Sequence, residues 1–333
     1  MSESVKYSHY HDKAGFVVRG GPKVQPPTHD LHMARTFYLV SQLEAANWGT
    51  VQNYDGAAMS AGPLHVIGVY PSNSKQGPLW GMVRRVFDTS TSSEVIALKN
   101  KLGSLGWTVA PDGFVRLANG AAVNGVALVD QLSGPGGVVP PSGPVYDRAR
   151  GWAIAFHRAF TDPSSYSGQY EGTLDWLLAN FDSEADAYRK YVPGLTGDDA
   201  QVRRWVRTAD MAQVGPYLDL AMSVYHAFSV NAPGRAKQIL DRILARGLDV
   251  RAFSKALVTA LSNDTYGNWV ERGRRTMLTV SRSGLWPPAV VKDIYPGATA
   301  ASMIAYAVEG APYALALLLL IGGTGFYLSR HGA

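Results

Sequence analysis

The chain has 333 residues, of which 46% are hydrophobic and 17% charged, so it is too apolar for a disordered protein and long enough to build a sizeable core. It contains no cysteine, which excludes disulfides, thiolate metal sites and cysteine nucleophiles. The net charge of +5 favours anionic partners such as cell-wall polymers. Because the basic clusters lie within helical patterns, no nucleic-acid partner is expected.

Residues 1–30 are polar, rich in histidine and interrupted by Gly20, Gly21 and prolines, so an irregular N-terminal arm is predicted. They hold no apolar stretch of the ~7 to 15 residues that a secretory signal requires, and the chain is expected to lack a signal peptide. The histidines have no metal-ligand spacing beyond one H-x-H. Neither a metal nor a cofactor is predicted.

Residues 31–296 are expected to form the globular body. Its first helix is predicted over residues 31–46, where Met33, Phe37 and Val40 follow one face and Glu44 takes the next position on it. The helix is expected to have its cap at Thr28 or Asp30. A carboxylate thus ends an apolar stripe.

A small β-hairpin or compact loop is predicted for residues 48–70, where the helical period stops. Residues 79–87 form the next predicted helix. Residues 93–144 are interpreted as an insertion and linker, with a short helix, a second hairpin region and the Gly/Pro-rich stretch 133–144. Helical patterns fill residues 145–292, so the fold class is mainly α with a small β-hairpin region.

The C-terminal segment 299–328 is predicted to be one transmembrane helix. It includes eighteen uncharged residues, APYALALLLLIGGTGFYL, and a bilayer core needs ~20 mostly apolar residues. This segment would make the lipid bilayer a partner and locate the protein at a membrane through a C-terminal anchor. The alternative is a buried C-terminal helix of the bundle.

Residues 31–62 resemble the lysozyme superfamily, in which a helix ends in the catalytic Glu and a small β-hairpin presents an acidic residue followed by Ser or Thr and Gly. The matching residues are Glu44, Asp55, Ser60 and Gly62. The resemblance, to phage-type muramidases and transglycosylase-like peptidoglycan hydrolases, implies a lysozyme-like α+β fold. It also implies that Glu44 and Asp55 are catalytic, with Ser60 holding a water molecule.

The residue types suit this chemistry, because glycoside hydrolysis needs one protonated and one ionised carboxyl group. A carboxyl group on an apolar helix face tends to keep its proton, which suits Glu44 as the general acid. Asp55 lies in a polar turn and would stay ionised. Glu44 as a solvated helix end and Asp55 as an ordinary turn residue are the alternative.

The candidate substrate-binding residues are Trp48, Tyr54, His65 and Tyr225. Aromatic rings at the first two positions are able to stack on sugars, whereas Trp80 is predicted to be a core residue. Tyr225 lies in LAMSVYHAFSVNAPGRA, which resembles the helix and turn around A-A-Y-N-A-G in transglycosylases. Here His226 stands where Asn is expected, which puts the glycan contact of Tyr225 in doubt.

Two shorter resemblances lie further along the chain. Residues 93–130 are similar to the core of small peptidoglycan-binding repeats but lack their downstream F-G-x-x-T portion, and they would form a wall-binding insertion. NWVERGRRTML resembles the Arg-rich helix that closes the phage lysozyme core.

We therefore expect a membrane-anchored peptidoglycan hydrolase that cleaves the β-1,4 glycan strand by general acid/base catalysis. Delivery in a phage particle or by an injection apparatus would explain the missing signal peptide, with virion or injection-apparatus proteins as partners. One alternative is a non-enzymatic structural protein of a virion or membrane. Another is a membrane-perturbing toxin whose apolar tail is the active part.

Overall fold

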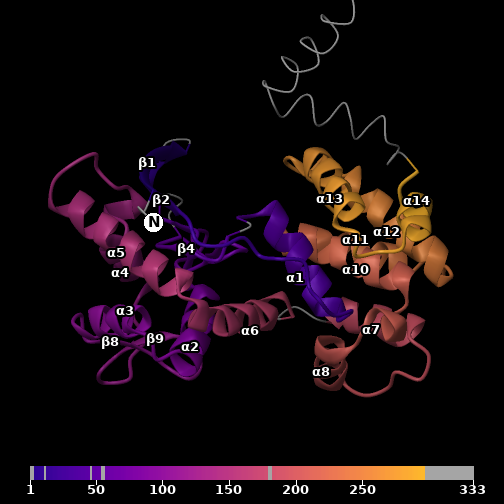
Figure 1. Cartoon of the computed structure of the whole chain (residues 1–333), viewed down its shortest axis with the longest axis horizontal. Coiled ribbons are helices and arrows are strands. Elements are labelled where there is room, and N and C mark those ends of the chain that lie inside the picture. Colours follow the sequence, from indigo (N-terminus) through magenta and orange to yellow (C-terminus); the bar gives the residue numbers. More distant parts are fainter. Residues whose placement is uncertain (1–3, 11–12, 46, 54–56, 179–181, 297–333) are drawn as a thin grey trace, which may run out of the picture.

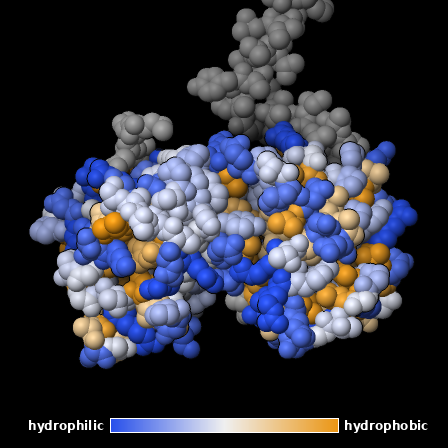
Figure 2. Space-filling model, turned by 60° about the horizontal axis from the view of Figure 1, so that its bottom comes forward, coloured by the Kyte–Doolittle hydropathy of each residue, from blue (hydrophilic) through white to orange (hydrophobic). Residues whose placement is uncertain are grey.

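The structure is a computed structural model that describes residues 4–10, 13–45, 47–53, 57–178 and 182–296. The chain forms two lobes side by side (Figure 1). The first lobe holds the β-strands and helices α2 to α6, and the second holds α1 and the helices from α7 onward (Figure 1). The surface narrows between the lobes (Figure 2).

The helices are α1 (His32–Leu43), α2 (Leu79–Thr89), α3 (Ser93–Gly103), α4 (Gly125–Leu132), α5 (Pro144–Thr161), α6 (Tyr166–Leu177), α7 (Asp182–Tyr191), α8 (Asp199–Thr208), α9 (Met211–Val214), α10 (Pro216–Ser229), α11 (Pro233–Leu244), α12 (Val250–Ser262), α13 (Trp269–Ser283) and α14 (Pro288–Ile294). The strands are β1 (Ser4–Tyr10), β2 (Lys13–Arg19), β3 (Val51–Gln52), β4 (Ser60–Ala61), β5 (Val66–Ile67), β6 (Val69–Tyr70), β7 (Lys75–Gln76), β8 (Trp107–Val109) and β9 (Val115–Leu117).

The main sheet is antiparallel, in the order β1-β2-β3-β4-β5. Its first two strands correct the prediction of an irregular arm over residues 1–30, because β1 and β2 pair along their whole length. The glycines and prolines that suggested irregular structure all follow β2. In β1, the alternation of Val5 and Tyr7 with polar residues was the strand signal that this prediction overlooked.

Asn53 joins the sheet to the helices of the first lobe. Its side chain is buried, accepts a hydrogen bond from Phe16 N at 2.8 Å, and donates to Leu132 O at 3.1 Å and Ala149 O at 3.2 Å. These bonds connect the Asn53 side chain to backbone groups of β2, α4 and α5. They fix the start of the segment between β3 and β4.

Helices α2 and α6 approach closely because α6 presents glycines to α2. A Cβ atom added to Gly172 would lie 2.5 Å from Met82 Cα, and one added to Gly168 would lie 2.7 Å from Val86 Cα. Real Cβ contacts are longer, so only glycine permits this spacing. The contact holds α6, whose C-terminal end reaches the second lobe, against the first.

Helix α1 forms as predicted, with Met33, Phe37 and Val40 buried. Its predicted cap is wrong, since no side chain caps its first turn. Instead Ala209 O accepts a hydrogen bond from His32 N at 2.9 Å, and the Asp30 carboxylate pairs with Arg35. The helix packs against α8, α10 and α13, so it belongs to the second lobe.

A buried polar network ties α1 to the rest of the second lobe. His32 lies 2.6 Å from Asp219 Oδ1 through Nδ1, and 2.6 Å from the Tyr188 hydroxyl through Nε2. Trp286 Nε1 donates to the other oxygen of Asp219. Burial raises the pKa of Tyr188 well above its ordinary value, and the neighbouring carboxylates raise it further. The hydroxyl therefore stays protonated.

The mainly helical fold with small sheets is confirmed, but the transmembrane part of the fold prediction is corrected. Among the described residues, no helix is both long and apolar enough to cross a membrane. The segment 299–328, on which that prediction rested, lies outside the described residues.

Candidate functional site

Glu44 lies where the second lobe meets the strands of the first. It follows the last residue of α1, and its own N–H donates to Val40 O and Ser41 O at 3.2 Å, which fixes the helix end. The side chain is 21% exposed and its carboxylate accepts a hydrogen bond from Arg272 of α13. The expected apolar environment is therefore wrong: the carboxylate faces a buried cation and an open cleft.

The cleft has a volume of about 590 Å³ and is lined by both lobes. The first lobe contributes the turn between β4 and β5, β6 and the end of α6, and the second contributes α1, α7, α10 and α11. Aromatic side chains line it at Tyr70, Trp176 and Tyr225, and carboxylates line it at Glu44, Asp182 and Glu184. Aromatic faces beside a few polar groups are typical of small-molecule and sugar sites.

Two of the predicted substrate-binding residues lie in this cleft with Glu44. His65 lines it from the turn between β4 and β5, where its φ of 51° is unusual for a residue other than glycine. Tyr225 lines it from α10. Burial raises the pKa of Tyr225, and the carboxylates of Glu184 and Asp241 raise it further, so its hydroxyl stays protonated.

Ser60 and Trp48 are placed elsewhere. Ser60 lies fully buried in β4, opposite Gln52 and Ile67, and does not line the cleft. Trp48 stacks on Tyr166 with ring centres 4.7 Å apart and lies beside Phe37, in a separate groove of about 500 Å³. The position of Trp48 four residues after Glu44 suggested proximity, but the chain turns away from the cleft after α1.

Tyr54 and Asp55 lie outside the described residues. The strands on either side of them form the predicted hairpin, in which Val51 pairs with Ala61 and Gln52 with Ser60. A helix followed by a β-hairpin is therefore present between α1 and β4.

Glu184 lies in the same cleft and was not singled out from the sequence. It is 2% exposed, and its Oε2 lies 3.2 Å from His226 Nε2 on α10. The signal was its position four residues before Tyr188, which places a carboxylate on the buried face of α7. The cleft thus holds a buried carboxylate from a distant part of the chain in addition to Glu44 and Asp182.

No family model matches the chain, and neither does any curated protein or solved structure. The lysozyme-like assignment therefore stays a prediction that depends on the residues described above.

Two cationic side chains, Arg272 and Lys237, lie beside the carboxylates of the Glu44 cleft. The Arg272 side chain is 9% exposed, and Arg272 Nε donates to Ala227 O at 2.7 Å, which orients the guanidinium toward Glu44. Lys237 lines the cleft from α11 and donates to Ser183 Oγ at 2.7 Å and Asp241 Oδ2 at 2.9 Å. Within the described ranges, no group of three or more His, Asp or Glu side chains is arranged to hold a metal ion.

Residues 93–130 form the predicted short helix, α3, and the predicted hairpin, β8–β9; they also include the start of α4, which was not predicted from the sequence. They are part of the first lobe rather than a separate module. The side chain of Gln76 bonds to the backbone of Val115 and Val123 at 2.7 to 2.9 Å, and Lys101 lies 4.7 Å from the Trp152 ring centre. Apolar side chains nevertheless remain exposed on this region, at Ile96, Phe114, Leu117 and Val126.

Proposed function

We propose that the chain is a peptidoglycan hydrolase that cleaves the β-1,4 glycan strand, with Glu44 as the general acid. The observation that carries the proposal is the position of Glu44. Its carboxylate lies at the end of a helix, in a cleft between two lobes, among aromatic side chains suited to sugars. A polymer strand lying in the cleft would place a glycosidic oxygen beside this carboxyl group.

In this reaction the proton donor is the protonated form of Glu44 rather than the carboxylate that pairs with Arg272. It gives its proton to the leaving glycosidic oxygen while the C–O bond to the sugar breaks. The positive charge that develops on the sugar needs a nearby carboxylate. Water supplies the hydroxyl group of the product, and its other proton passes to this second carboxylate. We assign the second carboxylate to Asp55, in the segment between β3 and β4. Tyr225 and His65 would contact the bound strand.

The Glu44–Arg272 pair also fits the alternative of a non-enzymatic structural protein, in which the pair only stabilises the packing of α1 against α13. The two functions differ in one measurable product. A hydrolase releases reducing ends from purified peptidoglycan, whereas a structural protein leaves the glycan intact.

The test compares wild type, Glu44→Gln and Glu271→Gln for the release of reducing ends. Glu44→Gln keeps the shape of the side chain but removes the transferable proton, so the rate should fall ~100-fold or more. Glu271→Gln makes the same chemical change at an exposed residue of α13 and should keep the full rate. A wild-type rate of zero on several wall types would favour the structural protein, and an unchanged rate in Glu44→Gln would reject Glu44 as the acid.

A further inference from the structure

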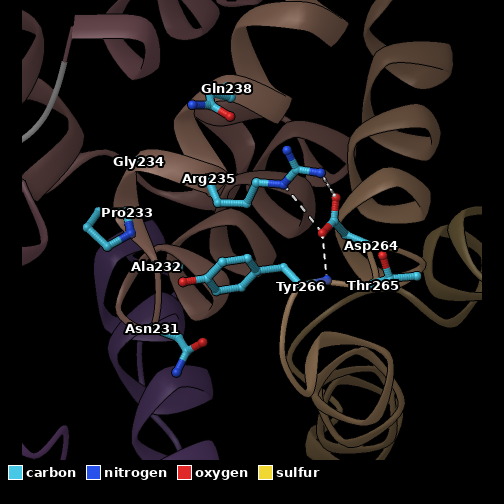
Figure 3. Close-up of a pocket in the computed structure, with 9 residues that line it drawn as sticks. All are labelled: Asn231, Ala232, Pro233, Gly234, Arg235, Gln238, Asp264, Thr265 and Tyr266. Atoms are coloured by element: carbon cyan, nitrogen blue, oxygen red, sulfur yellow. Dashed lines mark hydrogen bonds and ion pairs between the residues drawn. The ribbon is translucent and has the colours of Figure 1, made fainter.

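A second hollow adjoins the cleft at the turn between α10 and α11. It has a volume of about 740 Å³ and is lined by this turn, the first turns of α11 and the loop after α12 (Figure 3). Asn231, Pro233 and Gly234 line both the hollow and the Glu44 cleft. The two cavities therefore adjoin each other and share part of their walls.

Arg235 presents an oriented hydrogen-bond donor to the hollow. Its Nη2 donates to Asp264 Oδ2 at 2.7 Å, and Asp264 Oδ1 accepts a hydrogen bond from Tyr266 N at 2.9 Å (Figure 3). The bond from Arg235 holds the pKa of Asp264 below its ordinary value, so the pair stays charged at neutral pH. In the described part of the chain, the remaining nitrogen of Arg235, Nη1, has no hydrogen-bond partner.

Tyr266 supplies an aromatic surface beside this donor. Its side chain is 51% exposed, and its ring extends from the loop toward the turn at Asn231 and Ala232 (Figure 3). The ring packs edge to face against the buried Trp269, with ring centres 5.6 Å apart, and this contact limits its movement. Trp269 Nε1 also donates to Asn231 Oδ1 at 3.0 Å, which fixes the orientation of that amide.

We propose that this second hollow is a subsite for one further N-acetylated sugar of the glycan strand that occupies the Glu44 cleft. The apolar face of the sugar would stack on Tyr266, and Arg235 would donate to its carbonyl oxygen. The identity of the ligand rests on the proposed function. The arrangement of the Arg235 donor, the exposed Tyr266 ring and the wall shared with the cleft is independent of the proposed function.

The consequence is a dependence of affinity on strand length. Short oligomers occupy the cleft alone, whereas longer ones also reach Tyr266 and Arg235. Loss of one stacking contact typically reduces affinity by about fivefold to tenfold. That loss should be confined to the longer oligomers.

The test measures binding, by calorimetry, of N-acetylglucosamine oligomers from the dimer to the hexamer to the full chain. Tyr266→Ala and Arg235→Gln should lower hexamer affinity by about fivefold to tenfold and leave dimer affinity unchanged. Tyr266→Phe keeps the ring and should bind like the wild type, as should Arg282→Gln, at an exposed arginine of α13. Equal melting temperatures would show that the variants are folded.

The outcomes separate this subsite from the catalytic proposal. Hexamer binding that is unchanged in Tyr266→Ala overturns the subsite, whatever the reducing-end assay shows, and so does a wild type that binds no oligomer. A length-dependent loss in Tyr266→Ala supports the subsite even if Glu44→Gln retains activity, in which case the protein binds glycan without Glu44 acting as the acid.

Discussion

Arg272 donates a hydrogen bond to the carboxylate of Glu44, a residue 228 positions earlier in the chain. The same guanidinium donates to Ala227 O of α10. One buried cation therefore joins α1, α10 and α13 at the candidate catalytic acid. This relationship makes the position of Glu44 depend on a helix at the other end of the described chain.

Arg272→Met keeps the length of the side chain but removes both donors. It leaves the Ala227 carbonyl and the Glu44 carboxylate without these bonds, so the free energy of unfolding should fall by about 2 kcal/mol. Urea denaturation measures the difference. Arg274→Met is the matched control, because Arg274 pairs with Glu271 at the surface, at 3.5 Å, and should change stability by less than about 0.5 kcal/mol. Equal losses in the two variants would contradict a structural role for the Glu44–Arg272 pair.

Asp219 carries the buried network of the second lobe. Asp219→Ala removes the acceptor of both His32 and Trp286, in a site with no access to water, and should reduce the free energy of unfolding by about 3 kcal/mol or more. The same substitution at Asp186, which is 64% exposed and pairs with Arg189, should cost less than about 0.5 kcal/mol. Thermal or urea unfolding followed by tryptophan fluorescence compares them, and a small effect at Asp219 would show that the network adds little.

Glycine-to-alanine substitutions in the neighbouring helices α2 and α6 should change the free energy of unfolding in opposite directions. Gly172→Ala places a methyl group 2.5 Å from Met82 Cα and should destabilise the fold by about 1 to 3 kcal/mol by forcing α2 and α6 apart. Gly81→Ala, within α2, meets no atom within 4 Å and should stabilise it by about 0.5 to 1 kcal/mol. Melting temperatures that shift in the same direction would refute the close crossing of α2 and α6.

Asp293 should make stability depend on pH. Hydrogen bonds from Arg251, Lys255 and Tyr217 hold the pKa of Asp293 well below its ordinary value. The folded state therefore keeps the carboxylate ionised at a pH where the unfolded chain binds a proton. Its stabilisation is present above the unfolded pKa of ~3.9 and is lost as the pH falls below it.

Asp293→Asn should accordingly lower the melting temperature at pH 7, with a difference from wild type that shrinks progressively as the pH falls below ~3.9. Scanning calorimetry across this range is the measurement. A difference that stays constant with pH would show that the carboxylate contributes through shape rather than charge.

Local patterns in the sequence predicted the elements around the site but not how they meet. The stripe of Met33, Phe37 and Val40 identified α1 and placed Glu44 at its end, because helical periodicity depends only on neighbouring residues. Arg272 as the partner of Glu44 required knowing that α13 packs against α1. That pairing is a property of the whole chain, and no local spacing encodes it.

The difference between local sequence pattern and long-range packing also explains which cleft residues were predicted wrongly. Trp48 follows Glu44 closely, yet the direction of the chain after α1 turns its ring toward Tyr166 in another groove. Glu184 lies in the cleft although it is far from Glu44 in the sequence, because the buried face of α7 places it next to His226 of α10. A prediction based on proximity along the sequence therefore placed Trp48 in the cleft wrongly and did not include Glu184.

The position of α1 also sets the order in which a growing chain completes its parts. The helix packs against α8, α10 and α13, so its partners are synthesised only after the whole of α2 to α6. The first lobe meets its own partners much earlier. A chain still attached to the ribosome would therefore carry a completed first lobe while the faces of α1 that contact α8, α10 and α13 are still uncovered, and chaperones that bind apolar segments would find them there. The cleft around Glu44 would be the last region to form.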